Sequence, residues 1–460
     1  MTKNHEMNLT EGPLFKRMIL YALPLIATNL LQYLFNVVDI AVLAAFVGDN
    51  AVAAVGSTTS LVHLMGNLFI GISVGANILI ARFVGKNDKD GARKTVGTAI
   101  FSSLIFGVVI MLIGFFGAET FLKWMDCAPE VIGMATKYLK IYFLGMPIMM
   151  VYNFSAAVLR AVGDTFRPFL YLIIGGVANV GLNILFVTVF HQDVAGVAIA
   201  TVASQGIAAV LAMISLFKGD GFGKFEWKRF RIYKTEFLQM LRIGVPAGLQ
   251  GMMFPLANLF IQSAINSFGA TVMAANTVAT QVDAIIFQIT AAIGHTAAAF
   301  VGQNYGAKKT DRIKRSVWQA AMLSFGICVG LGFFVIFLRN PLCGLLTDDP
   351  GVIYYAKQKL VITAAFQFFY GLLDVFANAV RGLGKSLTAM LVNLFGICVF
   401  RLVYLATVFR AFPTYFVLCW AFPASFVVAF VAILCCYFPT LKKAEQKLAE
   451  ETVVEKDKGE

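Results

Sequence analysis

The sequence predicts an all-α integral membrane protein with twelve transmembrane helices in two six-helix bundles that are parallel repeats of each other. Three observations support this fold class: 59% of the 460 residues are hydrophobic, only 13% are charged, and the apolar residues form twelve long runs. Soluble proteins carry roughly 25% charged residues. The composition therefore argues against a soluble enzyme, a nucleic-acid-binding module and a secreted disulfide scaffold.

The twelve apolar runs are expected to be helices, because an open backbone in lipid would leave its amides and carbonyls unpaired. A transmembrane barrel would instead show short segments of alternating polarity. The first run is longer than the core of a signal peptide, so we interpret it as a retained span. The predicted spans are 18–47, 52–80, 95–117, 131–158, 168–190, 194–217, 238–267, 272–301, 316–338, 352–380, 388–410 and 414–438.

The basic residues predict an orientation. With both termini in the cytoplasm, 29 of the 37 Lys and Arg residues lie on the inner side and 7 on the outer side. This bias fits the positive-inside rule and indicates a multi-pass protein of the plasma membrane, such as a bacterial inner membrane. The basic clusters are short, so no nucleic-acid partner is expected. The outer residues are Lys123, Lys137, Lys140, Arg339, Lys357, Lys359 and Arg410, and Arg401 lies within a span.

Short motifs recur between the two halves of the chain. Residues 129–132 and 160–163 match 350–353 and 381–384 at an offset of 221. Each half has six spans, so both halves enter the membrane from the same side, as in a parallel repeat. Two further matches were assigned: residues 84–87 with 301–304 at an offset of 217, and Leu23-Pro24 with Val245-Pro246 at 222.

The spans and loops divide the chain into five parts. The linker between the two halves, residues 218–237, is basic and aromatic. This composition is typical of a segment at the inner membrane surface, although a solvated loop explains its charge equally well. The parts are a cytoplasmic N-terminus (1–17), an N-lobe bundle (18–217), the linker (218–237), a C-lobe bundle (238–438) and a charged cytoplasmic tail (439–460).

Asp39 is the sharpest functional candidate, because an ionisable residue inside a span is costly and usually marks an ion or substrate path. Gln32 and Asn36 precede it at positions i−7 and i−3, on one face of the first predicted helix. Pro24 removes a backbone hydrogen bond upstream and allows the helix to bend. A carboxylate at this position can hold Na⁺ or a proton. The alternative is a structural carboxylate that pairs with neighbouring amides.

Neutral oxygen donors in the fifth and sixth spans could complete such a site. Asn179 and Asn183 are four residues apart, on one helix face, and Thr201 follows in the next span. Oxygen ligands suit a hard cation such as Na⁺, and the same groups could stabilise a proton on Asp39. Such side chains also serve as polar contacts between membrane helices.

The second half carries two more acids within spans, Asp283 and Asp374. They could form a second cation site or line a substrate cavity. The other candidates for this cavity or second site are Gln32, Asn36, Asn153 and Tyr370. Alternatively, one of the two acids pairs with Arg401. Three intramembrane acids against one Arg favour a cationic substrate. Arg160 and Arg381 are interpreted as anchors at the cytoplasmic surface.

The chain resembles the multidrug and toxic compound extrusion (MATE) transporters over about residues 12–440. Each matching motif is short, but their order and spacing over twelve spans are characteristic. The motifs are Ala22-Leu23-Pro24, Asp39 ahead of Val47-Gly48 and Ala53-Ala54-Val55-Gly56, Arg160-Ala161-Val162-Gly163-Asp164, Gly244-Val245-Pro246, Ala274-Ala275-Asn276 and residues 301–307.

The resemblance implies a V-shaped pair of bundles and an antiporter that exports cationic or amphipathic compounds in exchange for Na⁺ or H⁺. It assigns Asp39 as the first-span aspartate, Pro24 as the bend proline, and Asn179 and Thr201 as oxygen donors. Asn183 stands where many members carry a second aspartate, so the site has one negative charge fewer, and Na⁺ and a proton both stay open as the coupling ion.

We accordingly expect no enzymatic activity and no cofactor beyond the coupling ion, which would be held as a metal only if it is Na⁺. The expected partners are small-molecule substrates and the lipid bilayer, with the chain as a monomer. Two alternatives remain open. A flippase for lipid-linked precursors would favour a cationic cavity, and a membrane-embedded enzyme would need a nucleophile–base pair or a metal cluster.

Overall fold

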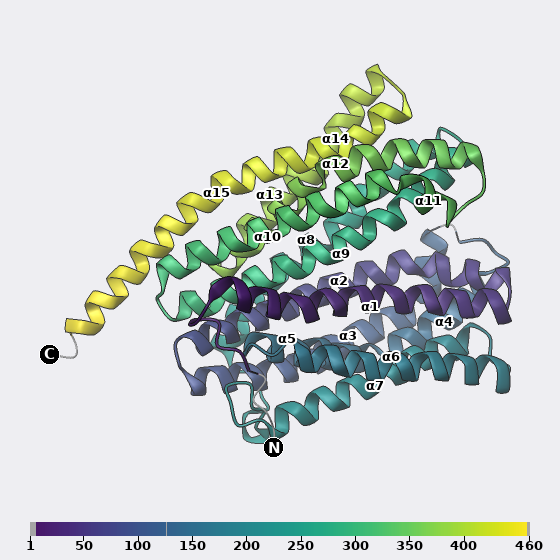
Figure 1. Cartoon of the computed structure of the whole chain (residues 1–460). Coiled ribbons are helices and arrows are strands. Elements are labelled where there is room, and N and C mark those ends of the chain that lie inside the picture. Colours follow the sequence, from purple (N-terminus) through teal and green to yellow (C-terminus); the bar gives the residue numbers. More distant parts are fainter. Residues whose placement is uncertain (1–5, 126, 458–460) are drawn as a thin grey trace. The chain divides into compact units, whose positions relative to one another are not determined.

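Every regular element in the described part of the chain is a helix (Figure 1). The computed structural model describes residues 6–125 and 127–457. The first five and last three residues of the predicted cytoplasmic ends therefore lie outside the described residues. Eleven helices are long and apolar enough to cross a membrane, or twelve when a bent pair is counted as one span. The predicted all-α membrane fold is confirmed.

The helices coincide with the twelve predicted apolar runs, with the short α11 as an addition. In the first half they are α1 (Leu14–Phe46), α2 (Asp49–Gly85), α3 (Lys89–Trp124), α4 (Ile132–Leu144), α5 (Met146–Ala161), α6 (Phe166–Ile184), the π-helical η1 (Leu185–Val189) and α7 (Val194–Lys218). The second half contains α8 (Lys234–Asn266), α9 (Ala270–Gly306), α10 (Thr310–Phe337), α11 (Arg339–Gly344), α12 (Pro350–Gly382), α13 (Ser386–Asn393), η3 (Leu394–Val399), α14 (Phe400–Tyr404), η4 (Leu405–Phe409) and α15 (Tyr415–Asp457).

Large apolar side chains cover the outer faces of these helices. Phe116 on α3, Val177 on α6 and Phe333 on α10 are 76%, 71% and 72% exposed. Water would penalise such a surface, because each exposed Å² of apolar area costs about 25 cal/mol relative to burial. The exposed rings and branched side chains therefore mark a surface that lies in lipid.

The fourth predicted span, 131–158, is broken in the middle. Helices α4 and α5 meet at Gly145 with a bend of 48°. Pro147 stands in the first turn of α5 and has no N–H to donate to the preceding turn. The corresponding span in the second half, α12, has no proline at this point and runs unbroken over 33 residues.

Helices α2 and α9 repeat each other with an offset of 221 residues. Helices α2 and α9 begin at Asp49 and Ala270 and end at Gly85 and Gly306. Asn87 and Lys308, which follow these helices, have φ angles of 59° and 58°. The match of residues 84–87 with 301–304 at 217 is therefore wrong by one helical turn. The misalignment arose because Val301-Gly302-Gln303-Asn304 resembles Val84-Gly85-Lys86-Asn87 but lies one turn earlier in the repeat.

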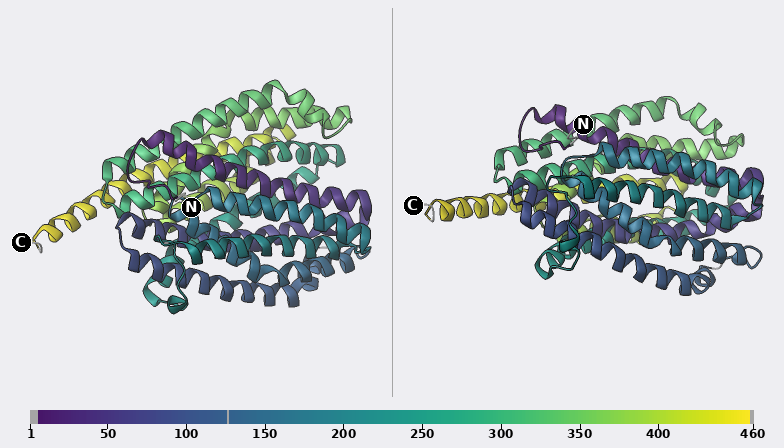
Figure 2. Two further views of the ribbon diagram at one scale, coloured as in Figure 1. Left: turned by 60° about the horizontal axis from the view of Figure 1, so that its bottom comes forward. Right: turned by 90° about the horizontal axis from the view of Figure 1, so that it is seen from below.

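The chain forms two compact units, whose boundaries differ from the predicted lobes. The N-terminal unit contains residues 1–8 and 23–248, and the C-terminal unit contains residues 9–22 and 249–460. The basic linker therefore does not separate the units. The divisions fall within α1 and α8, next to Pro24 and Pro246. Figure 2 shows that the helices within each unit run alongside one another.

Residues 9–12 are fixed to the ends of α9 and α10 within the C-terminal unit. The Leu9 N–H donates to Gln303 Oε1 over 3.1 Å, and Lys309 Nζ donates to the Thr10 carbonyl over 2.9 Å. Arg312 donates to the carbonyl of Gly12 over 3.0 Å. These bonds attach residues 9–12, which belong to the predicted cytoplasmic N-terminus, to the second unit.

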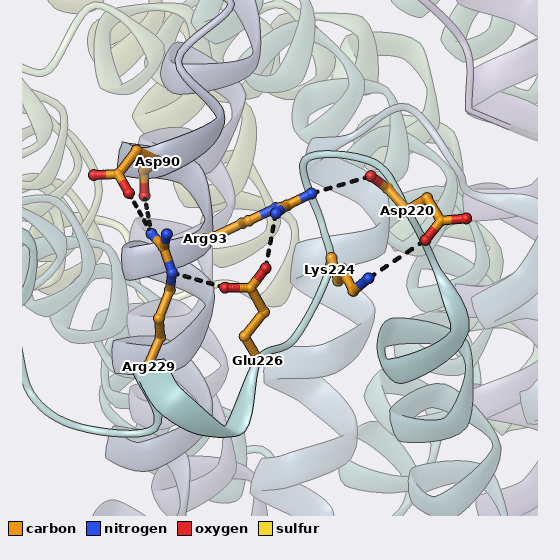
Figure 3. A network of polar contacts seen from close by, with 6 residues as sticks. All are labelled: Asp90, Arg93, Asp220, Lys224, Glu226 and Arg229. Atoms are coloured by element: carbon orange, nitrogen blue, oxygen red, sulfur yellow. Dashed lines mark hydrogen bonds and ion pairs between the residues drawn. The ribbon is translucent and has the colours of Figure 1, made fainter.

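The linker after α7 folds back onto the start of α3 (Figure 3). Glu226 accepts from Arg93 over 2.7 Å and pairs with Arg229 over 2.8 Å. Arg229 also pairs with Asp90 over 2.6 Å, and this carboxylate holds the pKa of the guanidinium above its usual value. Phe225 is buried against the rings of Phe217 and Trp227. The linker is thus packed against the N-terminal unit and does not behave as a free solvated loop.

Candidate functional site

Asp39 lies inside the N-terminal unit, in the C-terminal quarter of α1. The residue as a whole is 7% exposed. Asn183 on α6 donates from Nδ2 to Asp39 Oδ1 over 2.6 Å, and Thr201 on α7 donates from Oγ1 to Asp39 Oδ2 over 3.2 Å. Helix α1 therefore meets α6 and α7, which are distant from it in sequence, at one carboxylate.

The two asparagines on α6 extend the site. They stand one helical turn apart, so both face α1 and α7. Asn183 Nδ2 also donates to Asn179 Oδ1 over 3.2 Å, and Asn179 Nδ2 donates to Thr201 Oγ1 over 3.5 Å. The structure thus brings together the four residues Asp39, Asn179, Asn183 and Thr201, as the sequence predicts.

One acceptor in this cluster has no partner. Asn183 Oδ1 is buried and receives no hydrogen bond from the described residues. An unsatisfied buried acceptor costs about 1–3 kcal/mol unless a donor or cation reaches it. The oxygen stands beside a carboxylate that forms no ion pair with any described Lys, Arg or His. The cluster therefore has one negative charge and a spare acceptor.

The remaining predicted residues of the first half lie outside this cluster. Gln32 and Asn36 are exposed, and Asn36 donates to the Gln32 carbonyl of its own helix over 3.1 Å. Asn153 on α5 is half-buried and donates to the Met149 carbonyl over 2.9 Å. Pro24 lies inside α1, where its carbonyl accepts from Thr28 over 2.7 Å. The polar stripe of α1 therefore enters the site only at Asp39.

The two acids of the second half occupy separate places. Asp283 on α9 accepts from Thr363 on α12 over 3.1 Å. Asp374 lies beside Gly294, where an added Cβ would stand 2.0 Å from Asp374 Oδ2. From the first contact to the second, α9 advances eleven residues (Asp283 to Gly294) and so does α12 (Thr363 to Asp374). The two carboxylates are therefore about 16 Å apart along the helices. The two acids do not share one cation site.

The predicted alternative of pairing with Arg401 is not observed. The Arg401 side chain is fully buried and donates to Ser425 over 3.0 Å and to Asn258 over 2.9 Å. Tyr370 packs its ring against Phe287 and Phe426, with centroid distances of 4.6 and 5.2 Å. The structure thus places Tyr370 in an aromatic cluster.

Lys359 and Arg381 are buried inside the C-terminal unit, so the count of intramembrane charges made from the sequence was incomplete. Lys359, counted among the outer loops, is 3% exposed inside α12 and donates to Asn276 over 2.7 Å. Arg381, interpreted as a surface anchor, is 5% exposed and donates to Asn378 over 2.7 Å and to Gln250 over 2.9 Å. The C-terminal unit therefore holds three cations against the acids Asp283 and Asp374 in its spans. The argument for a cationic substrate from three acids against one Arg is wrong for this unit.

The chemistry of the Asp39 cluster limits what it can hold. The described residues contain no group of three or more His, Cys, Asp or Glu side chains that could bind a metal. One carboxylate with neutral amide and hydroxyl oxygens suits a weakly held monovalent cation or a proton. It does not provide the ligand set of a resident transition metal.

Comparisons with known proteins agree with this architecture. The sequence pattern of the MatE family matches residues 24–185 and again residues 246–407. The chain is 27% identical to the probable multidrug resistance protein YoeA of Bacillus subtilis (strain 168), over 83% of this chain and 84% of that protein. It is 23% identical to the multidrug export protein MepA of Staphylococcus haemolyticus (strain JCSC1435), over 82% and 83% of the two chains.

A solved structure shares the fold. A crystal structure of MATE in the bent conformation superposes with a TM-score of 0.90 at 20% identity, covering 98% of this chain and 100% of that one. The two family matches are offset by 222 residues, in agreement with the internal repeat. Since the family pattern covers more than half of the sequence, this chain belongs to the MatE family of multidrug efflux transporters and is not an enzyme.

Proposed function

We propose that this transporter is a secondary antiporter that exports cationic or amphipathic compounds in exchange for Na⁺ or H⁺ at Asp39. The observation that carries the proposal is the environment of this carboxylate, which is buried among neutral donors with no cationic partner among the described residues. An isolated intramembrane charge is costly, so the carboxylate gains stability when a cation or proton neutralises it.

Neutralisation would change the hydrogen bonds of the cluster. A proton on Asp39 turns one of its oxygens into a donor, for which the spare acceptor Asn183 Oδ1 is available. Na⁺ would instead collect the oxygens of Asp39, Asn179 and Asn183 around itself. In either case α1 shifts against α6 and α7, and Pro24 leaves α1 without one backbone hydrogen bond that would resist bending.

This movement of α1 couples ion binding to substrate release in the proposed exchange cycle. Substrate binds from the cytoplasm or the inner leaflet, and an external cation or proton then binds at Asp39. The bending of α1 disfavours bound substrate and releases it outward. The antagonism must be reciprocal, so bound substrate must weaken cation binding by the same factor. No cofactor other than the coupling ion is required.

The membrane and orientation belong to the same proposal. The excess of Lys and Arg on one side supports a plasma membrane, such as a bacterial inner membrane, with both termini in the cytoplasm. The matched relatives are named for multidrug resistance and export, which favours efflux over the flipping of lipid-linked precursors.

Dye efflux from proteoliposomes tests the proposal. The purified chain is reconstituted and loaded with a cationic dye, and an inward Na⁺ gradient is compared with an inward proton gradient. Efflux driven by one of the two gradients, and lost when the gradient is collapsed, supports antiport. Efflux that is independent of both gradients would refute it.

A further inference from the structure

A cavity of about 270 Å³ lies inside the C-terminal unit, distinct from the Asp39 cluster. Helices α8, α9, α12 and α15 form its walls, all with residues of this one unit. Among its lining residues are a cation, Lys359, and an acid, Asp283. We propose that this cavity binds a small aromatic carboxylate. The proposal goes beyond the exchange cycle and does not depend on Asp39.

The anion would be recognised first by Lys359. Its ammonium donates to Asn276 Oδ1 over 2.7 Å and to Thr280 Oγ1 over 2.8 Å. An ammonium has three N–H donors, so one donor is left after these two bonds. Because the side chain is 3% exposed and lines the cavity, a carboxylate in the cavity can accept that bond without competition from bulk water.

Gln367 provides an independent indication of a polar ligand. It is fully buried, it lines the same cavity, and neither its Nε2 nor its Oε1 has a hydrogen-bond partner among the described residues. Two unsatisfied buried atoms on one amide are unusual in a folded protein. Lys359, Thr363 and Gln367 stand at i, i+4 and i+8 of α12, so the amide shares one helix face with the ammonium. A carboxylate or hydroxyl group of a ligand would satisfy it.

The electrostatic balance of the unit favours a negative ligand. Arg401 lies behind the cavity wall, with its guanidinium over the rings of Phe254, Phe422 and Phe426, at 5.4, 4.7 and 5.5 Å. Its Nη2 has no partner among the described residues. Lys359 and Arg401 together outweigh Asp283 by one positive charge. A monoanion would neutralise this excess in a medium of low dielectric constant.

The walls define the rest of the ligand. Phe254, Phe287, Phe422 and Phe426 line the cavity and can pack against a ring by stacking or edge contacts. The volume is slightly below the range of about 300–1,000 Å³ that is usual for drug-sized ligands. One or two fused rings with a carboxylate therefore fit better than a large amphipathic drug.

Equilibrium binding to the full chain in nanodiscs tests this proposal without any ion gradient. The probe is the fluorescent 1-naphthoate, compared with 1-naphthylmethylammonium and 1-naphthalenemethanol, which share its rings but not its charge. We expect naphthoate to bind at least about tenfold more tightly than either, as one charge-assisted hydrogen bond predicts. Equal or tighter binding of the ammonium probe would overturn the proposal.

Variants then assign the binding to this cavity. Lys359→Met should weaken naphthoate binding at least about tenfold, whereas Lys359→Arg should retain most of it. Asp283→Asn should strengthen binding, because Asp283 is the only acid among the described residues that line the cavity. A purely structural role would instead make both changes weaken binding. Lys357→Met serves as the matched control, since it removes a charge from the same helix outside the cavity.

The outcomes separate the alternatives. Unchanged binding in both Lys359→Met and Asp283→Asn would place naphthoate elsewhere and overturn the proposal, as would an equal loss in Lys357→Met. Lys359→Met could fail to give a monodisperse protein. In that case two measurements still test the proposal: the comparison of the three probes on the native chain, and the direction in which Asp283→Asn changes naphthoate binding.

Discussion

Asn183 donates a hydrogen bond from Nδ2 to Oδ1 of Asp39 over 2.6 Å, although 144 positions separate the two residues in the sequence. The bond joins α1 to α6 in the interior of the N-terminal unit. Asn183 also keeps a buried oxygen without a partner, immediately beside the carboxylate. The pair therefore combines a buried carboxylate with an acceptor that only a proton donor or a cation can satisfy.

Replacement of Asp39 by Asn should abolish gradient-driven efflux. The amide keeps the size of the side chain but can neither be protonated nor attract a cation, so the coupling step is lost. We expect dye efflux from proteoliposomes to fall at least tenfold, to about the rate of liposomes without protein, a loss comparable to removing one charged interaction. Asp49→Asn, an exposed acid in the first turn of α2, is the control and should retain efflux. Full efflux by Asp39→Asn would exclude Asp39 from coupling.

Replacement of Asn183 by Asp should increase the dependence on Na⁺. Two carboxylates within hydrogen-bonding distance repel each other unless a cation or a shared proton lies between them. We expect the Na⁺ concentration that gives half-maximal efflux to fall by about tenfold, equivalent to about 1.4 kcal/mol. Asn50→Asp adds the same charge at an exposed position and should leave this concentration unchanged. A higher Na⁺ requirement in Asn183→Asp would contradict the proposed site.

A methyl group at Gly71 should destabilise the N-terminal unit. An added Cβ there would lie 2.2 Å from the Cα of Gly248, so α2 and α8 would have to separate. Overpacking of this kind costs about 1–3 kcal/mol. Thermal unfolding in detergent should show a lower midpoint for Gly71→Ala. Gly66→Ala, on the same helix with no atom within 4 Å of the new Cβ, should be neutral or stabilising. Equal midpoints for the two variants would argue against this helix crossing.

The stability contributed by Asp193 should depend on pH. Burial raises the pKa of Asp193, but the Ala195 N–H and the Lys137 ammonium outweigh it, so the pKa lies below the usual 3.8. A lowered folded-state pKa means that the contribution is present above the unfolded pKa and is lost as pH falls through the folded pKa.

Asp193→Ala tests this at two pH values. The residue caps α7, with its Oδ1 accepting from the Ala195 N–H over 3.0 Å. At neutral pH the variant should be less stable by about 1 kcal/mol. At about pH 3 the difference should shrink, because the wild-type carboxyl begins to protonate. Asp348→Ala, in an exposed loop, should show no such pH-dependent difference. A constant difference for Asp193→Ala would rule out the carboxylate as the cause.

Much of the fold could be predicted because lipid leaves few alternatives. Each apolar run had to form a helix to pair its backbone, and all twelve runs did so. The break at Gly145 was missed, although Pro147 in the middle of a span was the available signal. The offset of 217 was also wrong, because a four-residue motif cannot distinguish two successive helical turns.

The site was predicted in part. Asp39, Asn179, Asn183 and Thr201 were selected for their polarity inside apolar runs, and they meet in the structure. Lys359 was missed because a count of loop charges treats every Lys near a helix end as exposed. Its signal was the spacing of Lys359, Thr363 and Gln367 at successive turns, which indicates a polar helix face directed inward.

The sequence alone determined a chain of membrane-spanning helices, repeated once, with a few costly polar residues in its spans. Hydropathy and helical periodicity are properties of neighbouring residues in the sequence, so they can be read without knowing the tertiary structure. Only the tertiary structure decided that Asp39 is surrounded by neutral donors, that Asp283 and Asp374 are apart, and that Lys359 is buried beside Asn276. These relationships depend on which helix faces meet, and side chains 80 or more residues apart make contact only through packing.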